Sequence, residues 1–470
     1  FDKFGGNLRT SGCVSFMFTK KGIVIVENNG VDEDTIMEDA FEFGADDMSV
    51  EDEVVEISCE PSELGTLREG LVSKGYNVVS AEVDQIPSTY TTLTDEEHIK
   101  KMNLLLEHLE DNDDVQNVNI ITDDEQKLLD KFNNTYGKIN RAPVSKIFEE
   151  QAVLHADDVA VICDDKFLTY KELNERANSL AHYLISKGVK PNDIIAIMTN
   201  RSLETIVCML GILKAGAAFL NVDPTYPIDR TEYYINDSKI ERVLTQKELR
   251  EKVAQIKNSI EIDLDNTEIY GKHTSNPNVS VKETDLSYII YTSGSTGTPK
   301  GVMLNQIGMS NMVQAMTKVL DYLKEGNKHA IASVTSTPFD IFVYEIIVSL
   351  THGLKVVMAN NAEHRNPKLL DALIKKYNVD VMTVTPSLMK INYDNREPDT
   401  ALARVKNMVF GGEPLPEKFV QDLRALADDI TIYNIYGPSE ITILSNVQNL
   451  NGEKEITIGP PISVSYTHLR

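Results

Sequence analysis

Residues 286–301 combine the residue types that bind phosphate groups: an apolar strand runs into a loop of glycines and hydroxyl residues that ends at a lysine. Gly294 and Gly297 would let the backbone approach an anion closely, because neither carries a side chain. Backbone N–H groups, the loop hydroxyls and the ammonium group of Lys300 would then surround phosphate oxygens. The loop therefore predicts a phosphate site, with a flexible polar hairpin as the alternative interpretation.

This loop differs from a Walker A loop, which ends in Gly-Lys-Ser/Thr and leads into a helix. Here Lys300 is followed by Gly301 and by residues 302–304, whose apolar character predicts another short strand. The expected structure is a hairpin in which the loop joins two strands.

Composition and charge narrow the class of protein. The 470 residues are 41% hydrophobic and 25% charged, as in folded globular proteins. The net charge is −26, and residues 1–120, with 27 acidic and 8 basic residues, carry −19 of it. So acidic a chain repels nucleic-acid phosphates, and we do not expect direct DNA binding. The uneven charge suggests two units of different origin.

Cysteine usage and hydropathy give further expectations. The cysteines are Cys13, Cys59, Cys163 and Cys208. They show no CxxC or Cys/His pairing, so we expect no metal centre or disulfide framework and a cytoplasmic location. The longest apolar stretch, residues 203–220, contains Glu204 and Lys214 and predicts a core helix and strand rather than a membrane span. The chain begins at Phe1, so we expect its true start to be missing or processed.

Alternating helix and strand signals predict an α/β fold from about residue 123 onward. Thr169 and Glu172 form a capping box before a helix that ends at Gly188. Further helices and strands are expected at residues 194–198, 203–214, 217–222, 368–377, 379–384, 408–410, 417–426 and 431–435. This alternation is typical of largely parallel sheets covered by helices, whose ligands lie beyond the carboxyl ends of the strands.

The first part of the chain predicts a smaller α+β unit. Strands are expected at residues 22–26 and 54–58, and helices at residues 34–43, 61–74 and 95–110.

Five segments resemble, in order, the core motifs of adenylate-forming enzymes, specifically the amino-acid adenylation domains of non-ribosomal peptide synthetases. The segments are residues 168–173, 213–224, 286–301, 339–345 and 434–440. The resemblance implies the large N-terminal subdomain of that fold at residues 146–463. A linker at residues 120–145 would precede it, and residues 464–470 do not continue the pattern.

The resemblance implies ATP-dependent activation of an amino acid as aminoacyl-AMP, with release of pyrophosphate. The acyl group would then pass to the phosphopantetheine thiol of a separate carrier protein. Implied partners are therefore ATP, Mg²⁺, an amino acid, a carrier protein and a condensation domain. Two anions must meet in this reaction, so cationic and hydrogen-bonding groups must offset their repulsion.

The resemblance also assigns nucleotide-binding roles by position. The phosphates would contact Thr292, Ser293, Gly294, Ser295, Thr296, Gly297, Thr298 and Lys300. The adenine side of the site would be formed by Gly411, Gly412, Glu413, Asn434, Tyr436 and Gly437. Ser439 would contact the α-phosphate, and Glu440 would bind Mg²⁺, a hard cation that prefers carboxylate oxygen. Lys300, Thr296 and Glu440 are the implied catalytic residues. The alternative interpretation of residues 434–440, taken alone, is a Gly-Pro turn at a strand end.

For the amino acid, the resemblance implies that Asp340 pairs with the α-ammonium group, although an Asp before an apolar run is also a common helix cap. A buried ammonium needs such a partner because an unpaired charge is costly. The side-chain pocket would be lined by Ile341, Tyr344, Thr383, Val409, Gly411, Ile435, Ile443 and Leu444. We therefore expect a neutral, largely hydrophobic amino acid.

Two further expectations concern the chain's organisation. The family's ribose-binding Asp, its hinge and its small C-terminal subdomain do not follow in this sequence, so we expect weak nucleotide binding and low activity. Residues 1–119 resemble instead the C-terminal half of the YebC/TACO1 family, associated with transcription and translation. An alternative function is therefore a regulatory module with an inert adenylation-domain passenger, in a chain formed by a mis-joined reading frame.

Overall fold

A computed structural model describes residues 18–28, 33–50, 54–87, 140–254, 258–292, 298–324, 326, 328–427, 429–453 and 455–462. The chain divides into two compact units, residues 1–134 and 135–470.

The smaller unit is an antiparallel sheet of order β2-β3-β1-β4 with helices packed on it. Its elements are β1 (Phe18–Glu27), α1 (Glu33–Glu42), β2 (Ala45–Val50), β3 (Val54–Cys59), α2 (Leu64–Ser73) and β4 (Val78–Pro87). Ile36 and Leu67 of the helices pack against Val24 and Ile57 of the sheet. The four elements predicted between residues 22 and 74 are confirmed, whereas β2 and β4 were not predicted because acidic residues interrupt their alternation. The helix predicted at residues 95–110 lies outside the described residues.

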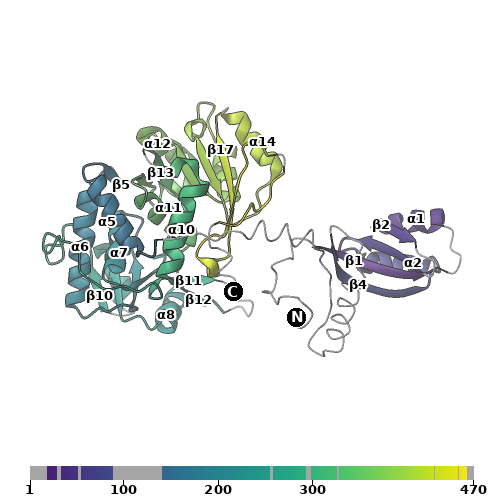
Figure 1. Cartoon of the computed structure of the whole chain (residues 1–470), viewed down its shortest axis with the longest axis horizontal. Helices are drawn as coiled ribbons and strands as arrows, with labels where there is room; N and C mark the ends of the chain where they lie inside the picture. The colour runs from purple at the N-terminus through teal and green to yellow at the C-terminus, as the bar shows by residue number, and fades with distance from the viewer. Residues whose placement is uncertain are drawn as a thin grey trace, which may run out of the picture. The chain divides into compact units, whose positions relative to one another are not determined.

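The larger unit contains two mostly parallel sheets (Figure 1). The six-stranded sheet has the order β10-β9-β7-β8-β11-β12. Its strands are β7 (Ile194–Met198), β8 (Ala218–Asn221), β9 (Arg242–Thr245), β10 (Asn258–Glu261), β11 (Leu286–Thr292) and β12 (Lys300–Asn305). All pairs are parallel except β11–β12, which is an antiparallel hairpin.

The eight-stranded sheet has the order β18-β17-β16-β15-β13-β14-β5-β6. Its strands are β5 (Val159–Cys163), β6 (Lys166–Thr169), β13 (Ala330–Ser333), β14 (Lys355–Met358), β15 (Val381–Val384), β16 (Asn407–Phe410), β17 (Thr431–Tyr436) and β18 (Asn446–Asn449). The central strands are parallel and only the edge pairs β5–β6 and β17–β18 are antiparallel. The predicted fold class, helix-covered and largely parallel sheets, is confirmed.

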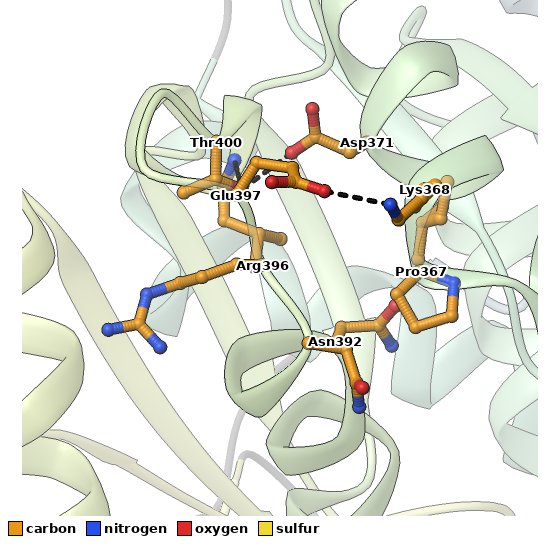
Figure 2. A pocket seen from close by; sticks show the side chains of 10 residues that line it. Pro367, Lys368, Asp371, Asn392, Arg396, Glu397 and Thr400 are labelled. Atoms are coloured by element: carbon orange, nitrogen blue, oxygen red, sulfur yellow. Dashed lines mark hydrogen bonds and ion pairs between the residues drawn. The ribbon is translucent and has the colours of Figure 1, made fainter.

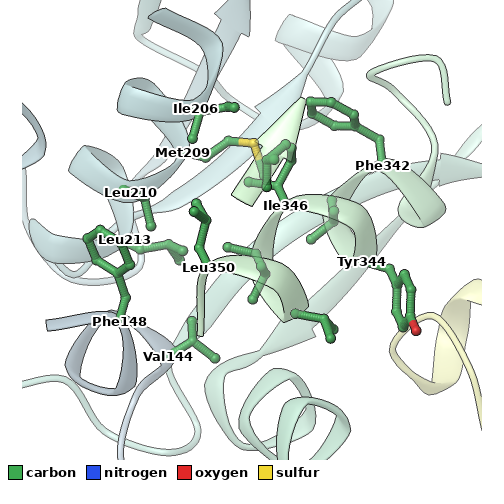
Figure 3. Packing of buried hydrophobic residues seen from close by; sticks show 14 of the residues in the cluster. Val144, Phe148, Ile206, Met209, Leu210, Leu213, Phe342, Tyr344, Ile346 and Leu350 are labelled. Atoms are coloured by element: carbon green, nitrogen blue, oxygen red, sulfur yellow. The ribbon is translucent and has the colours of Figure 1, made fainter. Parts of the chain in front are cut away.

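Helices between the two sheets create one shared core. They are α5 (Val144–Leu154), α6 (Tyr170–Ser186), α7 (Leu203–Lys214), α10 (Gln306–Val319) and α11 (Asp340–Leu350). Figure 3 shows Met209 and Leu213 of α7 directed toward Ile346 and Leu350 of α11, with Phe148 of α5 beside them. The same cluster includes residues from both sheets, so the sheets bury apolar surface against a common layer.

The outer faces of the sheets carry the remaining helices. The eight-stranded sheet is covered by α12 (Pro367–Tyr377), α13 (Pro386–Asp394) and α14 (Glu417–Leu426). The six-stranded sheet is covered by α8 (Ile228–Asp237) and α9 (Arg250–Ala254). Among the described residues, no helix is long and apolar enough to cross a membrane.

The capping box predicted at the start of α6 is present. The N–H of Glu172 donates to Oγ1 of Thr169 (3.2 Å), and the N–H of Thr169 donates to Oε2 of Glu172 (2.9 Å). Thr169→Ala should therefore reduce the free energy of unfolding by about 1 kcal/mol, measured by urea denaturation. Thr267→Ala, at an exposed site, is the control, and an equal loss in both variants would contradict a capping role.

Candidate active site

Most of the sequence-predicted residues that the structure describes lie in, or just after, the parallel strands of the eight-stranded sheet. The segments after β13, β15, β16 and β17 lie side by side at the carboxyl edge of this sheet because these strands are neighbours in register. Val409 of β16 is paired with Thr383 of β15 and with Tyr433 of β17. This edge is where open parallel sheets bind ligands.

The phosphate-loop segment forms the predicted hairpin. In the antiparallel ladder, Thr292 at the end of β11 is paired with Lys300 at the start of β12. Thr298 and Lys300 are exposed, so both side chains can reach a ligand. The loop residues between the strands lie outside the described residues; they are Ser293, Gly294, Ser295, Thr296 and Gly297.

Asp340 is the first residue of α11, at the end of the turn that follows β13. Its Oδ2 accepts a hydrogen bond from Oγ of Ser439 (2.7 Å). Burial raises the pKa of Asp340; hydrogen bonds from Ser439 and from the N–H of Ile341 oppose this rise, and the charge of Glu440 adds to it. Asp340 thus occupies a helix N-terminus and also contacts a residue predicted to bind nucleotide.

The segment after β17 connects this carboxylate to the hairpin. The helical turn η7 (Ser439–Ile441) contacts β12. A Cβ on Gly308, in the first turn of α10, would lie 2.5 Å from Oγ1 of Thr442. In β11, burial raises the pKa of Tyr288 and the nearby charge of Asp340 raises it further. The hairpin and Asp340 therefore lie on the same side of the fold.

The other predicted nucleotide-binding residues have different surroundings. Tyr436, at the end of β17, is 50% exposed, and Glu440 is also exposed. Oε2 of Glu413 accepts the N–H of Ser387 in the first turn of α13 (2.9 Å). The amide of Asn434 donates to the carbonyl of Thr457 (2.7 Å). An exposed aromatic ring can stack on a base, whereas the amide nitrogen of Asn434 already has a protein partner.

Two glycines permit close packing at this edge, and a third has a left-handed backbone conformation that favours glycine. A Cβ on Gly411 would lie 2.6 Å from Cγ1 of Ile435, so a larger residue there would require Ile435 to shift. Gly412 has a φ of +80°, and a Cβ there would lie 3.5 Å from Cδ1 of Ile341. A Cβ on Gly437 would lie 2.3 Å from the Cα of Leu444.

The predicted amino-acid pocket residues are almost all buried. Ile341, Val409, Ile435, Ile443 and Leu444 are at most 8% exposed. The hydroxyl of Tyr344 lies 3.2 Å from the hydroxyl of Tyr322, in the core between the helices. Oγ1 of Thr383 and the hydroxyl of Tyr288 are buried and have no hydrogen-bond partner among the described residues. Each of these hydroxyls is suited to a polar ligand atom, because an unpaired buried hydroxyl is costly.

Two buried residues of opposite charge that we did not predict from the sequence hold the turn leading to Asp340. Glu345 of α11 is 1% exposed and Arg201, after β7, is 5% exposed. Oε1 of Glu345 accepts the N–H and the hydroxyl of Thr335 (3.1 and 2.6 Å), and Oε2 accepts the hydroxyl of Ser333 (2.6 Å).

Arg201 binds carbonyl oxygens at the end of β13 and in the following turn, together with one carbonyl oxygen directly after β14. Its guanidinium donates to the carbonyls of Ser333 (2.7 Å), Thr335 and Ala359 (2.6 Å). Burial raises the pKa of Glu345 to about 7, although Arg201 and the hydroxyl donors lower it. The sequence signals were an arginine three residues after a buried strand and a glutamate within the apolar part of α11.

A small surface pocket on the outer face of the eight-stranded sheet lies apart from these residues. Figure 2 shows its ion pair, in which Nζ of Lys368 lies 2.9 Å from Oε1 of Glu397. Asp371 accepts hydrogen bonds from the hydroxyl of Thr400 (2.5 Å) and the N–H of Ala401 (2.7 Å). Its polar groups are thus used in internal contacts.

Fold and site together define an α/β protein with a hydroxyl-rich hairpin and a half-buried carboxylate at the ligand-binding edge of a parallel sheet. The family model described as AMP-binding enzyme matches residues 148–469, more than half of the chain, so the chain belongs to the AMP-binding enzyme family. A second model, described as the TACO1/YebC second and third domain, matches residues 1–120.

Similar proteins include the dimodular nonribosomal peptide synthase of Bacillus subtilis, 34% identical over 390 residues. Tyrocidine synthase 3 of Brevibacillus parabrevis is 36% identical over 342 residues. These alignments cover 81% and 72% of this chain but only 16% and 5% of the relatives, so the chain spans a small part of their length.

Solved structures of similar fold include the nonribosomal peptide synthetase FmoA3 (TM-score 0.68, 20% identity), covering 89% of this chain and 43% of that one. The N-terminal subdomain of Klebsiella oxytoca NpsA, in complex with 3-hydroxyanthranilyl-AMSN, has a TM-score of 0.60 and 21% identity. That match covers 70% of this chain and 80% of the other.

Proposed function

We propose that the chain activates an amino acid with ATP, forming aminoacyl-AMP and pyrophosphate. The observation that carries this proposal is the hydrogen bond from Ser439 to Asp340, which joins a proposed nucleotide-binding segment to the proposed amine-binding carboxylate. Support comes from the AMP-binding family and from relatives that are peptide synthetases. One FmoA3 structure is an α-methyl-L-serine-AMP bound form and another an AMPPNP bound form.

In the proposed reaction, a carboxylate oxygen of the amino acid attacks the α-phosphorus of ATP and pyrophosphate leaves. Thr292, Thr298 and Lys300 would bind the phosphates, together with the hydroxyls and N–H groups of residues 293–297. Ser439 would contact the α-phosphate, and Tyr436 would stack on adenine. These groups would stabilise negative charge where it increases in the transition state.

Glu440 is the residue we propose for Mg²⁺. Its carboxylate is exposed beside Ser439 and is the kind of hard oxygen ligand that this ion prefers. The described residues contain no group of three or more His, Cys, Asp or Glu side chains able to hold a metal ion. One carboxylate plus substrate phosphates is a usual Mg²⁺ environment. When bound, the ion would neutralise phosphate charge.

The proposed amino acid has a neutral side chain. The residues assigned to its pocket are mainly apolar, and Asp340 would be occupied by the α-ammonium group. The unpaired hydroxyl of Thr383 extends the choice from purely apolar side chains to small hydroxyl-bearing ones. A carrier protein with phosphopantetheine, and a condensation domain, remain proposed partners.

Thermal unfolding of the full chain tests this function. With MgATP present, a panel of apolar and hydroxyl-bearing amino acids should include at least one that raises the midpoint beyond MgATP alone. Amino-acid-dependent release of pyrophosphate is the second measurement. No response to ATP in either measurement would exclude the proposed reaction.

The pH dependence of amino-acid binding is a separate prediction. Protonation of Asp340 removes the charge that holds the ammonium group, so affinity should fall as pH falls. Because burial raises the pKa of Asp340, the loss should begin above the pH range of an exposed aspartate, whose pKa is about 3.9. The measurement is the half-saturating amino-acid concentration between pH 8 and 4, a range that reaches the ordinary pKa of an aspartate. A flat profile would contradict the assigned role of Asp340.

A further inference from the structure

Helix α8 contacts the end of the loop that leads into β12. The hydroxyl of Tyr233 donates a hydrogen bond to the carbonyl oxygen of Pro299 (2.9 Å). Pro299 immediately precedes Lys300, the lysine of the hairpin. A single phenol on α8 therefore fixes the backbone at this strand end.

The other strand end is held by the same helix. The hydroxyl of Tyr291, the residue before Thr292, donates to Oδ2 of Asp237 at the end of α8 (2.6 Å). The hydroxyl of Ser238 lies 2.8 Å away and can donate to Tyr291 in turn. Burial and then the hydrogen bond to Asp237 raise the pKa of Tyr291 further above neutral pH, so the phenol is a hydrogen-bond donor there.

The ring of Tyr291 fills the space between the hairpin and the helix. On one side it stacks on Tyr234 of α8, with ring centroids 4.0 Å apart and an interplanar angle of 13°. On the other side it faces Gly301, its partner in the antiparallel ladder. A Cβ on Gly301 would lie 3.1 Å from Cζ of Tyr291, so the ring fits against the strand because this residue is glycine. The base of the hairpin cannot shift without disturbing α8.

We propose that Tyr233 and Tyr291 are positioning residues for the triphosphate of ATP. They hold the two strand ends so that Thr292 and Lys300 already stand where the phosphates bind. Neither tyrosine contacts the nucleotide; each acts through the backbone that it holds. We call their hydrogen bonds to Pro299 and Asp237 the tether. Binding to groups that are already ordered does not require the free energy of ordering them, so the tether should increase affinity for ATP. This inference rests on the proposed function.

The tether acts on phosphate contacts, so its loss should affect the binding of ATP and AMP differently. Under the proposed function, ATP would contact the hairpin through its β- and γ-phosphates, whereas AMP has neither group. Loss of the tether should therefore weaken ATP binding and leave AMP binding unchanged. A tyrosine that only supported the fold would change both affinities or lower the unfolding midpoint.

The experiment compares the full wild-type chain with Tyr233→Phe and the matched control Tyr234→Phe, titrating each with MgATP and with AMP by calorimetry. Tyr234 is adjacent in α8, and its hydroxyl accepts a hydrogen bond from Arg230 (2.8 Å) rather than contacting the loop. We expect Tyr233→Phe to raise the Kd for MgATP about three- to tenfold, the range of one hydrogen bond, with AMP and the unfolding midpoint unchanged. Tyr234→Phe should match the wild type with both nucleotides.

The possible outcomes separate the two claims. Equal MgATP affinity in Tyr233→Phe and the wild type would overturn the tether while leaving the proposed function intact. Parallel losses for MgATP and AMP, or a lowered unfolding midpoint, would assign Tyr233 a purely structural role and also overturn it. A wild-type chain that binds MgATP no better than AMP would overturn the proposed function and the tether together.

Discussion

Replacing Glu345 with alanine should destabilise the larger unit by about 3–5 kcal/mol, because a buried guanidinium and several buried hydrogen-bond donors would lose the carboxylate that offsets them. The change would leave the guanidinium of Arg201 buried without a counter-charge. It would also leave the hydroxyls of Ser333 and Thr335 without their acceptor. The measurement is the free energy of unfolding in urea.

A double-mutant cycle separates this pair from general packing. Arg201→Ala should cost about as much as Glu345→Ala, and the double variant should cost less than their sum by about 1–3 kcal/mol. The surface pair in Figure 2 supplies the control, because Lys368 and Glu397 are both largely exposed. Lys368→Ala should change stability by at most about 1 kcal/mol. Additive effects of Arg201→Ala and Glu345→Ala would contradict an energetic coupling between them.

Replacing Asp340 with asparagine should abolish amino-acid-dependent stabilisation and retain the response to MgATP. Asparagine keeps an oxygen that can accept the hydrogen bond from Ser439, so the local structure should survive and only the charge is lost. Removing one partner of a desolvated charge pair costs about 2–5 kcal/mol, which raises the half-saturating amino-acid concentration by about 30-fold or more.

The control for this variant is Asp394→Asn, on the exposed surface of α13. Asp394 pairs there with Lys390 (3.0 Å), away from the proposed site. It should behave as the wild type with every amino acid. An Asp340→Asn chain that still responds to amino acids at wild-type concentrations would show that the ammonium group binds elsewhere.

The sequence predicted the elements of the larger unit well where local signals were strong. The helix at 203–214 and the strand at 194–198 have the predicted bounds, because a long apolar run and flanking turn residues mark each. The prediction of a hairpin was also correct. Gly301 and the apolar residues after it favour a strand over the helix that follows a Walker A loop.

What the sequence could not predict was which elements meet. Arg201 and Glu345 are 144 positions apart, and the residues adjacent to each do not indicate that the two are close in space. The hydrogen bond from Tyr233 to Pro299 likewise joins distant segments. Such contacts depend on the order of strands in the sheets, which apolar periodicity does not reveal. The sequence also did not predict that the strands of the larger unit form two separate sheets, one of six strands and one of eight.

The helices between the two sheets have a consequence for how the larger unit can be divided. A cut between residues 271 and 285 would leave β5 to β10 in the first fragment and β11 to β18 in the second. The six-stranded sheet would then lose β11 and β12, and the eight-stranded sheet would lose β5 and β6. Neither fragment would then have a surface of its own with which to cover the apolar sides of α7 or α11. The fragments should therefore aggregate when made singly and become soluble when co-expressed, as two parts of one cooperative folding unit.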